Sequence, residues 1–303
     1  MTWSDLIPLT LTKLTPLLLA TLGGLFSERS GVINFALEGM MLTGAFFAVW
    51  LSFLSGSPWL GLAAGATGGM AIACLHAFFC LKLRTNHILS SIALNLLAAG
   101  VTGVLLNEVF GLYGTSPAVT PLPKLSVQTL AACPVVGPGL VVFAGLPILV
   151  PISLIVSLLV AVFFKYTTLG LRIRACGENP LAADAAGIAV VRLRFLAVLM
   201  SGLAAGSGGA YLAIGELSQF VENMTGGRGY LAIAALILGR WNPVGIILAT
   251  VFLGLLEALS ESLAVTWSRF PAQLFLALPY LACILALTYG VGKRHPPSGL
   301  GQM

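Results

Sequence analysis

Charged residues are scarce in this sequence: Asp, Glu, Lys and Arg make up only 8% of its 303 residues. Hydrophobic residues make up 58%, and the mean hydropathy is +1.01. Soluble domains carry about 25% charged residues, so this balance excludes water as the main solvent of the folded chain. Apolar stretches recur along the whole sequence and leave no segment with the composition of a soluble catalytic domain. We therefore expect a single membrane domain over residues 1–303.

Several motifs that carry chemistry are also missing. The five cysteines form no C-x-x-C or other metal-binding spacing, and three of them lie in apolar segments, so we interpret them as packing residues. The sequence has no G-x-x-x-x-G-K-[ST] phosphate loop. It also has no paired catalytic constellation of the kind an intramembrane enzyme needs. We expect no catalytic residue, metal or cofactor in this chain.

Long apolar runs are what the sequence does have. A helix needs about 20 mostly apolar residues to cross a bilayer, and eight segments approach that length. Their predicted bounds are Leu6 to Phe26, Ile33 to Leu54, Trp59 to Leu81, Ile88 to Val109, Leu146 to Phe164, Leu193 to Ile214, Val244 to Leu263 and Pro271 to Tyr289. A ninth piece, Tyr230 to Leu238, has half the necessary length and lies between glycine-rich turns, which is typical of a short, broken or re-entrant helix. The predicted fold class is an all-α, polytopic helical bundle.

The distribution of Lys and Arg predicts the orientation, because these residues stay preferentially on the cytoplasmic side of a membrane. With the N-terminus outside, the C-terminus inside and the short piece crossing, eleven of the fifteen bases lie inside. The bases predicted to be inside are Arg29, Lys82, Arg84, Lys165, Arg172, Arg174, Arg192, Arg194, Arg240, Lys293 and Arg294. We expect the plasma (inner) membrane of a prokaryote, with residues 165–194 as the main cytoplasmic segment.

That cytoplasmic segment contains the pattern of a complete short helix. Asn179 can cap the first amides, Pro180 fits the first helical position, and Gly187 can supply a left-handed end. Isolated helices of about two turns are marginal in water, so a surface must hold this one. The helix could pack under its own membrane domain or dock into a partner, and the residues alone leave both readings open.

Three stretches of sequence carry a family resemblance. They are TTLGLRIRACGENP at 167–180 with AADAAGI at 182–188, GVINFALEGMM at 31–41, and GRGYLAIAALILGRWNP at 227–243. In this order they resemble the permease subunits of ABC importers, in the branch for simple sugars and nucleosides, related to the branched-chain amino acid permeases. The resemblance covers most of the chain from Leu25 to Leu256. It implies a second permease subunit, a cytoplasmic ATPase pair that supplies the missing phosphate loop, and an extracytoplasmic solute-binding protein.

The resemblance also implies roles for the cytoplasmic helix. Its residues would sit in a groove of the ATPase and transmit nucleotide-driven closure to the spans. The implied coupling residues are Glu178, Asn179, Pro180, Asp184 and Gly187, with Asp184 facing the partner or water. Arg172 and Arg174 are weaker candidates, because topology alone explains bases beside a span end.

Polar residues inside the predicted spans are candidates for the translocation path, because ionisable groups at membrane depth cost about 2.5–3.5 kcal/mol and need a partner or a wet cavity. Glu38 follows Asn34 by four residues, so in a helix the two would share a face. That face could line the path, or Glu38 could be protonated or locked to a neighbouring helix. Asn95 could bind a solute or another helix. Gly229 and Tyr230 complete the predicted path.

Other polar residues in the spans have simpler explanations. We expect Lys13 to snorkel to the headgroups and Glu257 and Glu261 to form a wet face near the outer end of a span. His76 is expected to be a satisfied core histidine.

Glycine spacing suggests two further features. Gly202 and Gly206 predict close helix contact. The Gly-bounded pieces 31–39 and 229–239 lie in the two halves of the chain, and transporters often build a central site from such paired broken segments. If this holds, Asn34, Glu38 and the turn at 226–230 converge.

The alternatives differ in what they require. An ion-coupled secondary transporter would need a midplane ion or proton site, which Glu38 and Glu257 could supply. A path with few fixed charges fits a neutral polar solute, and the resemblance puts nucleosides first, then simple sugars, with branched-chain amino acids or a flavin-type vitamin behind.

Overall fold

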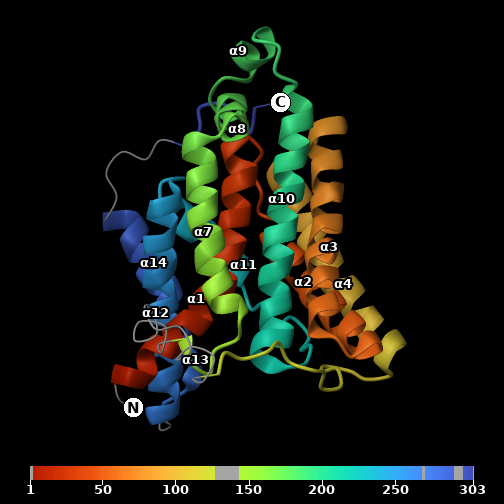
Figure 1. Ribbon diagram of the computed structural model, residues 1–303, viewed down its shortest axis with the longest axis vertical. Coiled ribbons are helices and arrows are strands. Elements are labelled where there is room, and N and C mark those ends of the chain that lie inside the picture. The colour runs from red at the N-terminus through yellow and green to blue at the C-terminus, as the bar shows by residue number, and fades with distance from the viewer. Residues whose placement is uncertain (1–2, 127–142, 268–269, 290–295, 303) are drawn as a thin grey trace.

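The computed structural model describes residues 3–126, 143–267, 270–289 and 296–302, and this part of the chain is almost entirely helical (Figure 1). Its elements are α1 (Trp3–Arg29), α2 (Leu37–Ser55), α3 (Pro58–Ala77), η1 (Phe78–Lys82), α4 (His87–Phe110), α7 (Leu149–Tyr166), α8 (Thr168–Glu178), α9 (Pro180–Ala185), α10 (Val190–Ala210), η3 (Tyr211–Leu217), α11 (Arg228–Leu238), α12 (Pro243–Thr266), α13 (Ala272–Leu276) and α14 (Leu278–Tyr289). The π-helical segments η1 and η3 continue α3 and α10. The predicted helical bundle is confirmed.

Seven helices in the described residues are long and apolar enough to cross a membrane. The candidate spans in them begin at Leu6, Leu37, Pro58, His87, Leu149, Val190 and Pro243. The eighth predicted span, Pro271 to Tyr289, is divided into the short helices α13 and α14. The short helix predicted at Tyr230 to Leu238 is α11, which begins two residues earlier, at Arg228. Cys133, which we interpreted as a packing residue, lies outside the described residues.

The core forms where α1 runs through the bundle against α10, α11 and α12. The leucines of α1 at 14, 17, 18, 22 and 25 are all almost fully buried. Figure 1 places α1 behind α7 and α10, with the N-terminus and α9 at opposite ends of the bundle. Helix α1 is therefore surrounded by protein. Helices α4 and α7 differ from it, because each has a large apolar surface facing outward.

Helices α3 and α10 meet through glycine. A Cβ on Gly206 would lie 2.4 Å from the carbonyl oxygen of Gly65, and one on Gly69 would lie 2.4 Å from that of Gly202. No side chain fits between backbones this close, so small residues are required at the crossing. The close helix contact predicted from Gly202 and Gly206 is confirmed.

The start of the second predicted span is not helical. Residues 32–35 have no regular secondary structure, and α2 begins only at Leu37. The prediction that Asn34 and Glu38 share a helical face is therefore wrong. The amide of Asn34 explains the break, because its Oδ1 accepts a hydrogen bond from the backbone N–H of Ala36 at 3.0 Å. An Asx-type bond of this kind competes with helical hydrogen bonding.

Candidate functional site

The carboxylate of Glu38 lies between the N-terminal ends of two helices. Glu38 itself belongs to the first turn of α2. Its Oε1 accepts a hydrogen bond from the backbone N–H of Gly227 at 2.8 Å, and its Oε2 accepts one from Gly229 at 2.7 Å. Helix N-termini carry partial positive charge and unpaired amides, so a carboxylate is favoured there. The carboxylate that this junction favours is therefore the chain's own Glu38.

The glycine-rich turn before α11 makes this approach possible. Gly226 and Gly227 have φ values of +53° and +85°, which L side chains rarely adopt. A Cβ on Gly229 would lie 2.4 Å from the backbone nitrogen of Glu38 and 2.7 Å from its Oε2. Gly229 therefore positions the site by having no side chain, so that the first turn of α11 can reach the carboxylate.

Asn95 on α4 joins the same junction from a third helix. Its Oδ1 accepts a hydrogen bond from the backbone N–H of Gly39 at 2.9 Å. Its Nδ2 donates to the carbonyl of Phe35 at 2.9 Å and to the hydroxyl of Tyr230 at 3.0 Å. Both amide protons of Asn95 are used, and the residue is only 9% exposed. Tyr230 has 47% of its surface exposed.

Asn34 lies apart from this junction. Its side chain is fully buried, and its Nδ2 donates to Ser201 Oγ on α10 at 2.9 Å. Glu38 thus meets the turn at 226–230 as expected, whereas the hydrogen bonds of Asn34 hold the extended segment against α10 instead. His76 is the satisfied core histidine that we expected, with Nε2 3.0 Å from the carbonyl of Ile33 and Nδ1 3.1 Å from Ser90 Oγ.

A cavity of about 550 Å³ lies beside the same turn and is lined by charged side chains. In it, Lys13 Nζ lies 2.5 Å from Glu216 Oε1 and 2.7 Å from Glu261 Oε2. Arg228 Nε lies 3.4 Å from Glu257 Oε1. The Tyr280 hydroxyl donates to the carbonyl of Gly226 at 2.8 Å, which closes one side of the turn. The lining residues are Lys13, Gly226, Arg228, Glu257, Ser260, Glu261, Ala264, Val265, Leu276, Pro279 and Tyr280.

This charged cavity corrects two expectations. Lys13 does not snorkel, because it is 7% exposed and paired with two carboxylates from other helices. Glu257 does not form a wet face, because its side chain is mostly buried beside Arg228, whereas Glu261 remains half exposed. The signal that sequence reasoning missed was the position of Lys13 inside an apolar span, where a charge calls for a partner.

The other end of the bundle carries the predicted short helix. Asn179 Oδ1 accepts a hydrogen bond from the N–H of Ala182 at 3.0 Å, Pro180 is the first residue of α9, and Gly187 has a φ of +77°. The predicted caps of this helix are confirmed. Asp184 is exposed, and Leu181 has 83% of its surface exposed. Helix α8, which we did not predict, precedes α9, and Thr167 caps it by accepting from the N–H of Gly170.

Helix α8 is fixed to the end of α1. A Cβ on Gly177 would lie 2.2 Å from the carbonyl oxygen of Arg29, and Arg29 pairs with Glu178 at 3.6 Å. The guanidinium of Arg194 donates to the carbonyls of Ser30, Cys176 and Gln302 at 2.7–3.2 Å. Burial raises the pKa of the Cys176 thiol, which keeps it protonated at neutral pH. The end of α1, the end of α8 and residue 302 therefore form one hydrogen-bonded unit.

Comparison with known proteins gives consistent results. Residues 6–287 match the family described as the branched-chain amino acid transport system permease component. The chain is 36% identical to the guanosine ABC transporter permease protein NupQ of Bacillus subtilis, over 98% of this chain and 95% of the relative. It is 36% identical to the nucleoside ABC transporter permease protein NupC of Lactococcus lactis (95% and 92%), and 34% identical to the putative glucose ABC transporter permease protein TsgC13 of Haloferax volcanii (95% and 92%).

A solved structure shares the fold. It is titled as an inward-facing conformation of a putative metal-chelate type ABC transporter, and it matches with a TM-score of 0.53 and 17% identity over 94% of this chain and 86% of that one.

Proposed function

Because this chain belongs to the branched-chain amino acid transport system permease family and is the membrane subunit of an ABC transporter, we propose that the solute it passes is a nucleoside. Relatives at 36% identity carry guanosine and nucleoside in their names, and a more weakly matching relative carries glucose. A simple sugar is therefore the second candidate. As a permease component, the chain has its ATPase and solute-binding protein on other subunits.

One observation carries this proposal: Tyr230 is half-exposed next to the helix N-terminus whose amides are already bonded to the Glu38 carboxylate. In transporters, the N-termini of broken helices often point at an anionic group of the solute. Here the carboxylate of Glu38 occupies that position, so an anionic solute would be repelled and a neutral one tolerated. The flat ring of Tyr230 offers a surface on which a nucleobase stacks. This ring is held in place by the contacts of Glu38, Asn95 and Gly229. Asn34 bonds Ser201 and so holds the adjacent segment 32–36 against α10.

We further propose that α9 couples the path to the ATPase. Its apolar residue Leu181 and its acidic residue Asp184 point outward from a well-capped helix, as a docking element requires. A movement of α9 would pass through Glu178 and Gly177 to Arg29 at the end of α1. The irregular segment 32–36 follows the end of α1 and leads directly to Glu38, which bonds the α11 turn. Rigid-body coupling along this route fits a two-state transporter.

The orientation in the membrane follows from the distribution of Lys and Arg. The N-terminus lies outside and α8, α9 and residues 296–302 lie in the cytoplasm, because the clustered bases favour that side. We place the chain in the plasma (inner) membrane of a prokaryote, paired with a second, different permease subunit.

The test is uptake of radiolabelled guanosine by vesicles that contain the complete transporter. Tyr230→Ala removes the stacking surface, which is worth about 1–3 kcal/mol per base, so KM should rise between about 5-fold and 150-fold. Tyr230→Phe keeps the ring but loses the hydroxyl that accepts from Asn95 Nδ2, so KM should rise less than in Tyr230→Ala. Tyr113→Ala, at an exposed tyrosine beyond α4, is the matched control. An unchanged KM for Tyr230→Ala, or glucose uptake without guanosine uptake, would remove the nucleoside proposal.

Coupling is tested separately. The double variant Asp184→Ala/Gly187→Ala should insert normally while ATP hydrolysis no longer drives uptake. Normal uptake by this variant would contradict the role of α9. Uptake that persists without ATP and follows an ion gradient would instead support an ion-coupled secondary transporter.

A further inference from the structure

A small cavity at the α8–α9 end of the bundle gathers positive charge and lies outside the proposed solute path. It has a volume of about 190 Å³ and is found where α7 ends and α12 begins. Figure 1 shows α8 lying across the ends of α1 and α7, both of which it contacts. The lining residues are Arg29, Ala161, Phe164, Lys165, Arg174, Asn242, Pro243 and Val244. Three of these residues are bases, and none is acidic.

The three bases have little compensating negative charge. Arg29 Nη1 lies 3.6 Å from Glu178 Oε1. Lys165 and Arg174 form no ion pair within the described residues. The Nε of Arg174 is also buried and has no hydrogen-bond partner there. One carboxylate therefore compensates three cations, and a buried guanidinium nitrogen calls for a ligand that accepts hydrogen bonds.

The start of α12 adds to the positive potential. Asn242, Pro243 and Val244 form the cap and first residues of this 24-residue helix, and all three line the cavity. The N-terminus of a helix carries a partial positive charge. Asn242 Oδ1 accepts a hydrogen bond from the N–H of Val244 at 3.0 Å, so the helix contributes its dipole. Arg29 is fixed beside it, because its Nε donates to the carbonyl of Trp241 at 2.8 Å.

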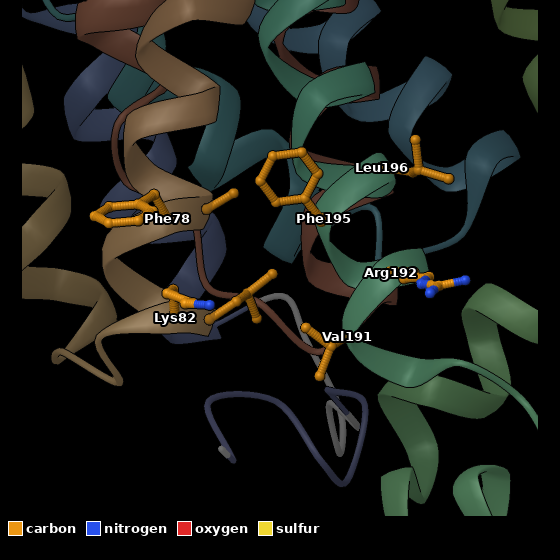
Figure 2. Close-up of a pocket in the computed structure, with 8 residues that line it drawn as sticks. Phe78, Lys82, Val191, Arg192, Phe195 and Leu196 are labelled. Atoms are coloured by element: carbon orange, nitrogen blue, oxygen red, sulfur yellow. The ribbon is translucent and has the colours of Figure 1, made fainter.

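A groove between η1 and the start of α10 provides a contrast. It has a volume of about 440 Å³, and its wall includes the bases Lys82 and Arg192. Figure 2 shows the side chain of Arg192 pointing away from Lys82, so the two charges do not converge on that groove. Their positions at span ends are explained by topology alone. The cavity beside α8 differs, because its three bases line one small space.

We propose that the cavity beside α8 binds one phosphate group, with Arg29, Lys165 and Arg174 as its cationic ligands. Guanidinium and ammonium donors around one small space complement a compact anion with several acceptor oxygens. The volume is below the roughly 300 Å³ of pockets for whole small molecules, so a single phosphate group fits the site better than the solute does.

The phosphate has two possible sources, an anionic phospholipid and the free ion. Two spans end at this cavity and a third begins there, which places it at the depth of the headgroups. Basic pockets between spans on the cytoplasmic side bind lipid headgroups, so we favour the lipid. This inference rests on the membrane location of the chain and is independent of the solute.

The test is ligand binding to the complete transporter in detergent. Native mass spectrometry measures phosphatidylglycerol, and equilibrium dialysis measures radiolabelled inorganic phosphate. Each base near the membrane surface contributes about fivefold in affinity, so Lys165→Gln/Arg174→Gln should weaken binding roughly 30-fold. The matched control Lys82→Gln/Arg172→Gln removes one lysine and one arginine that are exposed and do not line the cavity, and it should retain binding.

A second variant keeps all three cations and supplies a competing anion. Val244 is 59% exposed in the first turn of α12, where an acidic residue is favourable, so Val244→Glu should fold normally. Its carboxylate should compete with the phosphate group and lower the affinity about as much as Lys165→Gln/Arg174→Gln does. Val244→Gln has the same size without the charge and should retain binding.

The outcomes separate the two sources of phosphate. Phosphatidylglycerol binding that Lys165→Gln/Arg174→Gln and Val244→Glu both weaken, without binding of inorganic phosphate, supports a lipid headgroup. Inorganic phosphate binding that the same variants weaken supports the site with the free ion as its source. Unchanged binding in these variants, or no binding of either ligand because the ATPase fills the cavity, would overturn the proposal. Guanosine uptake, measured in parallel, reports on the solute and not on this cavity.

Discussion

Helix α9 and the turn before α11 are both short elements at the ends of longer helices, yet they are held in opposite ways. Helix α9 is defined by its neighbours in sequence, with Asn179 at one end and Gly187 at the other. The α11 turn is defined by residues far away, because its amides bond to Glu38 and its tyrosine to Asn95.

This difference follows from the different surroundings of the two elements. For the docking that we propose, α9 must hold its shape while remaining exposed, and local caps achieve that. An element inside the membrane must satisfy every polar group within the protein, which requires partners from several helices. The comparison predicts large effects where partners are distant and buried, and small effects where they are local and exposed.

The largest effect is expected at the charged cavity. Lys13→Met leaves Glu216 without its buried partner, and breaking such a pair costs about 3–5 kcal/mol. Thermal unfolding of the purified transporter should show this loss, whereas Lys165→Met at an exposed position should not. Lys13→Met/Glu216→Gln should recover part of it. A stable Lys13→Met variant would contradict the buried pairing.

An effect of about the same size is expected at Glu38. Glu38→Ala leaves the amides of Gly227 and Gly229 without acceptors, and each hydrogen bond to a charged group contributes about 1.5–3 kcal/mol. Unfolding temperature and uptake should both fall, with Glu38→Gln intermediate because it keeps one acceptor oxygen. The comparison fails if Glu38→Gln and Glu38→Ala behave like the unaltered protein.

A smaller effect is expected at Gly229. In Gly229→Ala the new methyl group meets the backbone of Glu38, and overpacking of this kind costs about 1–3 kcal/mol. Gly100→Ala adds the same methyl group where no atom lies within 4 Å, so it serves as the matched control. Equal stability of the two variants would show that the α11 turn is looser than described.

The smallest effect on stability is expected at α9. Asn179→Ala removes a cap worth about 1 kcal/mol at an exposed helix, so overall unfolding should hardly change. ATP-driven uptake should still fall, and Asn179→Asp should restore it because Asp also caps. A loss of global stability as large as that of Lys13→Met would erase the contrast between the two regions.

The same contrast explains what the sequence could predict. Span positions and the ends of α9 follow from hydropathy and from caps a few residues apart. Glycine spacing also pointed correctly to the meeting of Glu38 with the α11 turn. The pairing of Lys13 with Glu216 joins residues 203 positions apart, and no local pattern encodes it. Asn34 was misplaced because its own side chain stops the helix, so helical spacing did not apply.

The most direct measurement is photo-crosslinking from a benzophenone side chain at position 181 on α9, in vesicles that contain the complete transporter. We predict an adduct with the ATPase subunit, and none from the same label at Tyr113 at the opposite end of the bundle. An adduct between position 181 and the external binding protein, or an ATPase adduct only from position 113, would contradict the assignment of the two ends.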